Sequence, residues 1–176
     1  MRIDQFLKAL ATPGSRMGGG SVSALSAALS AALLEKLACA SAQQGARLCS
    51  MRQECQKLVL RDAEVFGAVM KALRSHKRAA FVSALKRANA VQWRVFECSL
   101  KTKHIAVTQA SRVKPALRSD LFCAAVLADS AACTAETFIR ANTEWLNDHR
   151  YAQTTQKRFD RLQVKSRVKP AKRRRA

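Results

Sequence analysis

Apolar residues recur every three or four positions along most of the chain, which is the period of an amphipathic helix. The first such stretch runs from Ile3 to Leu10 and ends at the helix-breaking cluster Thr12-Pro13-Gly14. Longer stretches with the same period cover about residues 21–37, 48–73, 79–100 and 121–147, with a weaker one ending at 112–115. No stretch has the alternating pattern that a half-buried strand requires. The sequence therefore predicts an all-α fold, a bundle of long amphipathic helices without a sheet.

The second of these helices presents two kinds of surface. Large apolar residues form one stripe at helical spacing, and we expect them to face the core. They are Val22, Leu25, Leu29, Leu33 and Leu37. Serine and alanine residues occupy much of the rest of the helix surface over residues 23–32. Small side chains of this kind allow a neighbouring helix to approach closely.

A carboxylate interrupts the apolar stripe of the third helix, because that stripe passes from Leu58 through Asp62 to Phe66. A buried carboxylate costs free energy unless it is paired or protonated, and burial raises its pKa. A carboxyl group with a raised pKa suits general acid–base chemistry near neutral pH. The alternative is structural, with Asp62 in a salt bridge to a basic side chain of an adjacent helix. The pattern leaves both open.

Three consecutive glycines, Gly18, Gly19 and Gly20, precede Ser21, a residue type that commonly caps a helix N-terminus. Glycines let a ligand approach the backbone closely, and the free N–H groups of a helix N-terminus attract anions. Because the run follows a helix rather than a strand, it matches neither a dinucleotide-binding fingerprint nor a P-loop. The same residues also fit a flexible loop followed by an ordinary cap.

Polar residues also occur in the last long helix. Asn142 lies on its inward stripe, where an amide needs hydrogen-bond partners. This position fits either recognition of a heterocycle or a hydrogen bond between helices. Ser119 and Asp120 fit the cap and the first turn of the same helix, where the helix dipole favours an acid.

The chain is strongly basic, with 32 Lys and Arg against 12 Asp and Glu in 176 residues and a formal net charge of +20. Residues 157–176 carry ten basic residues and one acid, and their composition indicates a disordered tail. We therefore expect a helical domain over residues 1–156 and a basic tail over residues 157–176. Such a tail can attract nucleic acid through phosphate contacts. Apart from Phe159, it has no aromatic residues for base stacking.

Other sequence features bear on metals, membranes and location. The six cysteines include no Cys-x-x-Cys pair and the three histidines are scattered, so we expect free packing thiols and no metal. The longest apolar stretch, from Val22, is broken by serines and is shorter than the roughly 20 residues of a membrane span. The N-terminus lacks the pattern of a signal peptide. We therefore expect a cytoplasmic protein that makes no membrane contact.

Three of these segments together resemble a known family. Thr12-Pro13-Gly14 followed by residues 18–25 is similar to the Pro-Gly-Gly-Gly-Ser-Val-x-Ala signature of the formiminotransferase-cyclodeaminase family. This family includes free-standing bacterial cyclodeaminases and methenyltetrahydrofolate cyclohydrolases. Residues 62–66 resemble its Asp-Ala-x-x-Phe segment, and residues 119–125 resemble its Ser-Asp-Leu-x-x-Ala-Ala stretch. Order and approximate spacing agree from about residue 3 to residue 148.

The resemblance implies an all-helical enzyme that forms a homodimer and needs no cofactor beyond its tetrahydrofolate substrate. The reaction it implies is ring closure of 5-formiminotetrahydrofolate to 5,10-methenyltetrahydrofolate with release of ammonia. Asp62 would then be the general acid or base, and Asn142 would bind the pterin. The full set of implied substrate-binding residues is Gly18, Gly19, Gly20, Ser21, Ser119, Asp120 and Asn142.

Two features depart from the family pattern. Residues 15–17 interrupt the proline-glycine run, and Phe138 stands where the family carries the first of two asparagines, Asn142 being the second. Two alternatives therefore stay beside the cyclodeaminase. One is a methenyltetrahydrofolate cyclohydrolase, in which water attacks the methenyl carbon and Asp62 serves as the same acid or base. The other is a member without activity whose basic tail binds nucleic acid.

Overall fold

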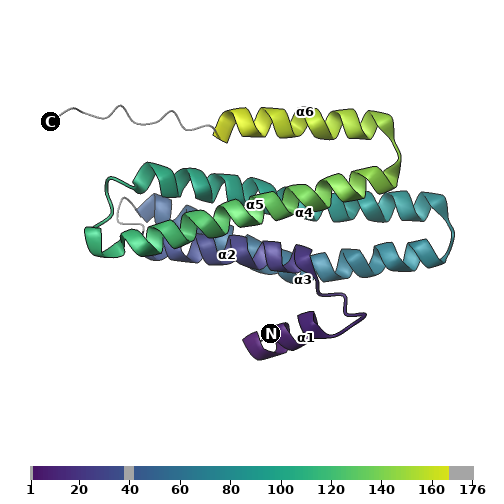
Figure 1. Ribbon diagram of the computed structural model, residues 1–176, viewed down its shortest axis with the longest axis horizontal. Helices are drawn as coiled ribbons and strands as arrows, with labels where there is room; N and C mark the ends of the chain where they lie inside the picture. Colours follow the sequence, from purple (N-terminus) through teal and green to yellow (C-terminus); the bar gives the residue numbers. More distant parts are fainter. Residues whose placement is uncertain (1, 38–41, 167–176) are drawn as a thin grey trace.

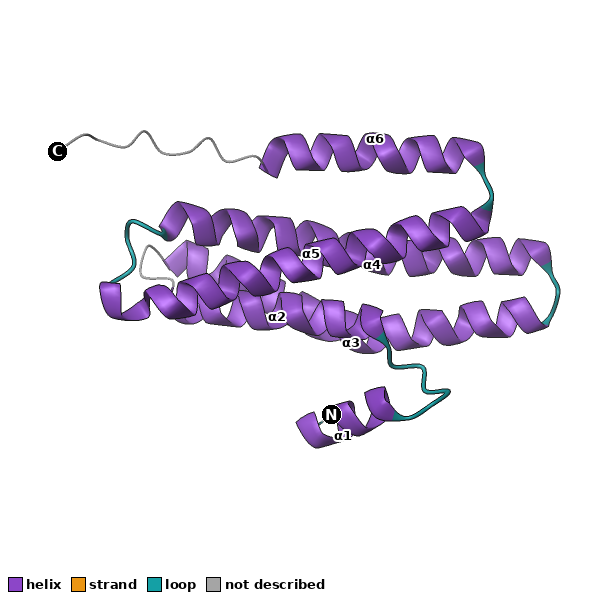
Figure 2. Cartoon of the chain, in the orientation of Figure 1, coloured by secondary structure: helices purple, strands orange, loops and turns teal. Residues whose placement is uncertain are grey.

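The computed structural model of the chain describes residues 2–37 and 42–166, and the elements in this part are all helical (Figure 1). No strand occurs among these residues, which confirms the predicted all-α fold (Figure 2). The described elements, in chain order, are α1 (Ile3–Ala11), α2 (Gly19–Leu37), α3 (Ala42–Arg74), α4 (Arg78–Gln109), the short 3-10 helix η1 (Pro115–Leu117), α5 (Arg118–Leu146) and α6 (His149–Ser166).

Four long helices, α2 to α5, form the bundle. Each packs against the next one in the chain, and α5 closes the ring by packing against α2. Helix α6 lies along the outside of the bundle and contacts α4 and α5, whereas α1 lies on the opposite side at the end of a loop (Figure 1). The architecture is the helical bundle that the apolar periodicity predicts.

The apolar stripe predicted for α2 is only partly buried, and the small-residue faces lie inward. Val22 and Leu29 are 39% and 47% exposed, although Leu37 is buried, and most of the inward residues are alanines and serines. Ser23 and Ser30 lie two turns apart, and their hydroxyls donate hydrogen bonds to main-chain carbonyls of α5 at 2.9 and 2.7 Å. Small side chains at this seam let the two helices approach closely, whereas a stripe of leucines would hold them apart.

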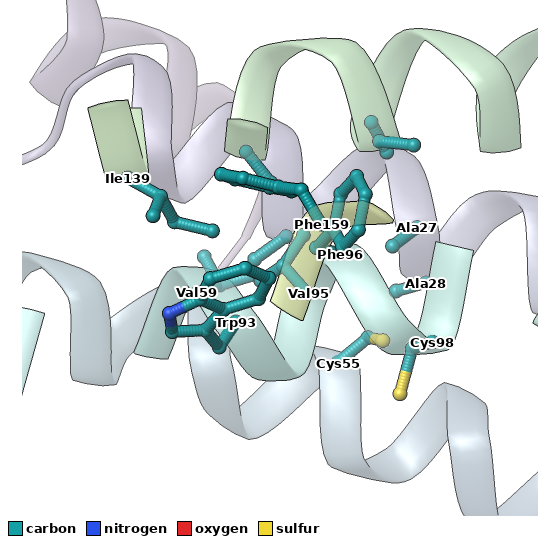
Figure 3. Close-up of a cluster of buried hydrophobic side chains, with 14 of the residues drawn as sticks. Ala27, Ala28, Cys55, Val59, Trp93, Val95, Phe96, Cys98, Ile139 and Phe159 are labelled. Atoms are coloured by element: carbon teal, nitrogen blue, oxygen red, sulfur yellow. The ribbon is translucent and has the colours of Figure 1, made fainter. Parts of the chain in front are cut away.

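An aromatic cluster lies where α6 meets α4 (Figure 3). Trp93 and Phe96 come from α4 and Phe159 comes from α6, and all three are buried. The ring centroid of Phe159 lies 4.4 Å from that of Trp93 and 5.2 Å from that of Phe96. Aromatic pairs at these separations stabilise a core beyond the area they bury. The cluster therefore attaches α6 to the bundle.

Helix α6 crosses the predicted boundary between domain and tail. The helix continues from residue 157 to residue 166, where the sequence predicts a disordered tail, and Phe159 is fully buried. The many basic side chains of this segment gave it the composition of a disordered tail, although it forms an amphipathic helix. One of them, Arg158, pairs with Glu97 on α4 at 2.6 Å and lies over the ring of Trp93. The remainder of the predicted tail, residues 167–176, lies outside the described residues.

Two helix bounds also differ from expectation. Helix α4 is continuous to Gln109, whereas the sequence predicts an end near residue 100 and a weaker helix after it. Two inward positions of this part of α4 hold the polar residues Ser99 and Thr102, which interrupt the apolar pattern. Both can be buried because their hydroxyls donate to main-chain carbonyls one turn earlier, at 2.8 and 3.1 Å. Helix α2 begins at Gly19, so that Ser21 lies in its first turn rather than at its cap.

One apolar segment, Pro115–Leu146, is long and apolar enough to cross a membrane by length and composition, because an 18-residue window within it has a mean hydropathy of 1.4. The core helix of a bundle has the same properties. In this structure the segment comprises η1 and α5, and α5 packs against α2 and α4.

Candidate functional site

A cavity of about 450 Å³ lies where the N-terminus of α2 meets α3, α4 and α5. Gly18, Gly19 and Gly20 line one wall, Asp62 projects from α3, and Asn142 lines it from α5. The structure therefore brings these predicted site residues to one cavity.

Asp62 is held by neutral hydrogen-bond donors. The Ser21 hydroxyl donates to Oδ2 at 3.0 Å, and Nε2 of Gln92 donates to Oδ1 at 2.7 Å. Burial raises the pKa of Asp62 above its ordinary value, although the hydroxyl and backbone N–H of Ser21 and the amide of Gln92 oppose that rise. No Lys or Arg among the described residues forms an ion pair with Asp62. The salt-bridge alternative for Asp62 is therefore wrong.

The glycine run makes room for the groups around it. A Cβ atom at Gly20 would overlap the carboxyl group of Asp62 and would lie 2.5 Å from Nε2 of Gln92. A Cβ atom at Gly19 would lie 2.7 Å from the ring of Phe138. Because Ser21 lies in the first turn of α2, the positive end of this helix faces Asp62. In this structure the helix N-terminus therefore holds the protein's own carboxyl group.

Gln92 is a site residue that sequence reasoning missed. It lines the cavity, is 2% exposed, and its Oε1 atom has no hydrogen-bond partner among the described residues. A buried amide oxygen normally accepts a hydrogen bond, so this atom is an unsatisfied acceptor on a residue that lines the cavity. The available signal was a polar residue four positions before Phe96, on the face of α4 that carries its apolar stripe.

Aromatic side chains form much of the remaining wall. Phe66, Phe138 and Trp145 line the cavity, and Phe66 and Trp145 are 43% and 54% exposed. Flat apolar surfaces of this kind favour a planar ring between them. Phe138, the residue that departs from the family pattern, packs over Gly19 at the start of α2.

The structure separates Ser119 and Asp120 from this cavity. Both lie at the start of α5, and Asp120 precedes the cavity residue Phe138 by 18 positions, or about 27 Å along the helix. Asp120 pairs with Lys36 at the far end of α2, at 3.0 Å. Helix α5 therefore separates Ser119 and Asp120 from Asp62 within one chain, and their role in substrate binding stays a prediction.

The donor set of the cavity suits an organic ligand. Across the described ranges, 2–37 and 42–166, no group of three or more His, Cys, Asp or Glu side chains is placed to hold a metal ion. The cavity combines one carboxyl group, one guanidinium group, two amides and three aromatic rings, in Asp62, Arg16, Gln92, Asn142, Phe66, Phe138 and Trp145. Such a set can bind a planar heterocycle and exchange a proton with it.

Comparisons with known proteins identify the family and the fold of the chain. The chain matches the model of the formiminotransferase-cyclodeaminase family over residues 2–161. Its fold is similar to that of a crystal structure of formiminotetrahydrofolate cyclodeaminase from Thermotoga maritima, with a TM-score of 0.86 and 21% sequence identity. That similarity covers 94% of this chain and 90% of the other. No curated protein matches the chain. Because the family match spans most of its length, this chain belongs to the formiminotransferase-cyclodeaminase family.

Proposed function

We propose that this protein cyclises 5-formiminotetrahydrofolate to 5,10-methenyltetrahydrofolate and releases ammonia. The observation that carries the proposal is the position of Asp62, a carboxyl group with a raised pKa in an aromatic-lined cavity beside the glycine run. The family match and the similar fold of a cyclodeaminase support the choice of a folate substrate.

The chemistry requires a proton at a defined atom. N10 of the substrate attacks the formimino carbon and forms a new C–N bond. The bond from that carbon to the former formimino nitrogen then breaks, and this nitrogen leaves as ammonia. The proton from N10 and one further proton end on the leaving nitrogen. Asp62, in its protonated form, is the group in the cavity that can donate the further proton.

Gln92 is suited to two tasks in this reaction. Its Nε2 atom donates to Asp62 and fixes the orientation of the carboxyl group. Its unpartnered Oε1 atom can accept a hydrogen bond from an N–H group of the substrate. Phe66, Phe138 and Trp145 would bind the faces of the pterin, and Asn142 its polar edge.

An absorbance assay tests the proposal, since 5,10-methenyltetrahydrofolate absorbs in the near ultraviolet and the substrate does not. We expect the wild-type protein to form this chromophore faster than the uncatalysed reaction. Asp62→Asn keeps the shape of the side chain but removes the acid, so it should lower kcat by about 100-fold or more. A wild-type rate equal to the uncatalysed one, or full activity in Asp62→Asn, would contradict the proposal.

A cyclohydrolase would use the same acid with water as the nucleophile. Both substrates should therefore be assayed side by side. We expect turnover of 5-formiminotetrahydrofolate to exceed hydrolysis of 5,10-methenyltetrahydrofolate, and the reverse order would assign the cyclohydrolase.

The homodimer belongs to the same proposal. Large apolar side chains on the outer faces of α2 and α5 are exposed, namely Val22 and Leu29 on α2 and Phe122 and Val126 on α5. The two helices pack against each other, and a second copy of the chain would bury this surface. Sedimentation velocity should give twice the mass of one chain, and Leu29→Asp should reduce it to a monomer. A wild-type monomer at micromolar concentration would contradict the dimer.

A further inference from the structure

A second cavity, of about 590 Å³, adjoins the one that contains Asp62. Ser15, Arg16 and Phe66 are wall residues of both. The second cavity extends from this shared wall along α3 toward its C-terminal end at Arg74. The two cavities therefore form one elongated groove.

The charges of the two compartments differ. Arg16, Lys71 and Arg74 line the second cavity, and no acidic residue does. These three side chains are exposed, and none of them forms an ion pair with another described residue. By contrast, Arg61 on the same helix pairs with Glu64 at 2.8 Å. The second cavity thus presents three uncompensated positive charges to whatever occupies it.

Arg16 is positioned by Gly67 of α3. A Cβ atom at Gly67 would lie 2.7 Å from Cδ of Arg16 and 3.3 Å from its Nη1. The side chain of Arg16 therefore lies directly against the helix at the junction of the two cavities. Arg16 belongs to the segment 15–17 that interrupts the proline-glycine run, so this interruption supplies a cation to the groove.

We propose that Arg16, Lys71 and Arg74 form a subsite for the carboxylates of the glutamate portion of the substrate. The inference rests on the proposed folate substrate, because a folate carries its reactive pterin at one end and a dicarboxylate at the other. Arginine guanidinium groups match carboxylates in geometry as well as in charge. With the pterin beside Asp62, the glutamate extends past the shared wall into the basic cavity.

The dimensions of α3 agree with this placement. Lys71 and Arg74 follow Asp62 by nine and twelve residues, which corresponds to about 14 and 18 Å along the helix. Lys71 and Arg74 are thus set well apart from Asp62, whereas Arg16 lies at the junction of the two cavities. Because they are exposed, each contact contributes modestly and is weakened by salt.

The test combines a shortened ligand with altered proteins. Calorimetry would measure binding of 5-formyltetrahydrofolate, which has oxygen in place of the formimino nitrogen, and of 5-formyltetrahydropteroate, which lacks the glutamate. The variant protein carries Arg16→Gln, Lys71→Gln and Arg74→Gln. Its matched control carries Lys57→Gln, Arg112→Gln and Lys114→Gln, which remove the same charge from exposed positions outside both cavities.

We expect the wild-type protein and the control to bind the glutamate-bearing compound on the order of tenfold more tightly than the pteroate. In the subsite variant, both compounds should bind with the affinity that the wild type has for the pteroate. A glutamate preference that persists in the subsite variant would overturn the subsite and leave the proposed function standing. Failure of the wild-type protein to bind either compound would overturn both.

Discussion

The carboxyl group of Asp62 is half-buried among neutral donors, and this environment links its protonation to folding. Below the pKa of an aspartate in the unfolded chain, both states hold the proton. Between that value and the raised pKa of the folded state, only the folded protein holds it. The pKa shift of Asp62 therefore makes the free energy of unfolding fall as pH rises through this window.

Asp62→Asn should remove that fall, because an amide does not titrate. We expect urea denaturation at a series of pH values to show a flatter pH dependence for the variant than for the wild type. Asp120→Asn serves as the control, since Asp120 pairs with Lys36 on the surface, far from the cavity. Parallel pH profiles of wild type and Asp62→Asn would show that the shift is absent.

Gly20 supports the same carboxyl group through its lack of a side chain. We expect Gly20→Ala to lower the free energy of unfolding by about 1–3 kcal/mol, because the added methyl must displace Asp62 and Gln92 from their hydrogen bond. Gly45→Ala, in α3, meets nothing within 4 Å and should instead raise stability by up to about 1 kcal/mol. Urea unfolding measures both. Equal effects of the two variants would mean that Gly20 is not sterically required.

The sequence identified a cavity residue where a charged side chain interrupted an apolar stripe. Asp62 stands out because a charged group on an apolar stripe needs an explanation, and the structure places it in the cavity. Gln92 does not stand out, since a glutamine in a helix is common and its burial depends on how α4 packs. Ser119 and Asp120 were grouped with the site by motif alone, which carries no information on the distance along α5.

At the scale of the elements, the seam between α2 and α5 is built from small residues. The sequence predicted both the helices and the small faces, but two residues of the apolar stripe of α2, Val22 and Leu29, are exposed. The spacing of apolar residues predicts Val22 and Leu29 in the core. In the structure, the face with Ser23 and Ser30 packs against α5 instead, because its small side chains permit a close approach. Which face of α2 packs inward depends on α5 as well, so it cannot be predicted from the residues of α2 alone.

A larger side chain at the seam tests this account. Ala128 of α5 is fully buried, so Ala128→Leu should push the helices apart and lower the free energy of unfolding by about 1–3 kcal/mol. Cys123→Leu adds bulk at an exposed position of the same helix and should change stability by no more than about 0.5 kcal/mol. Chemical denaturation distinguishes them. A tolerated leucine at position 128 would refute close packing there.

At the scale of the whole molecule, α6 completes the core from outside the four-helix bundle. Phe159→Ala should cost about 3–5 kcal/mol, because it opens a cavity beside Trp93 and Phe96. Arg161→Ala, at an exposed position on α6, should change stability by about 0.5 kcal/mol or less. Thermal and urea unfolding measure both variants. A negligible effect of Phe159→Ala would mean that α6 is not needed for the stability of the core.

No single stretch of the chain contains the groups that surround the proton of Asp62. The carboxyl group comes from α3, its hydroxyl and amide donors come from α2 and α4, and Asn142 faces the same space from α5. A loosened form that kept every helix but lost their mutual docking would have ordinary spectroscopic helicity and an ordinary, solvated aspartate. The proposed catalysis would thus depend on the assembled bundle and would be lost with its tertiary packing.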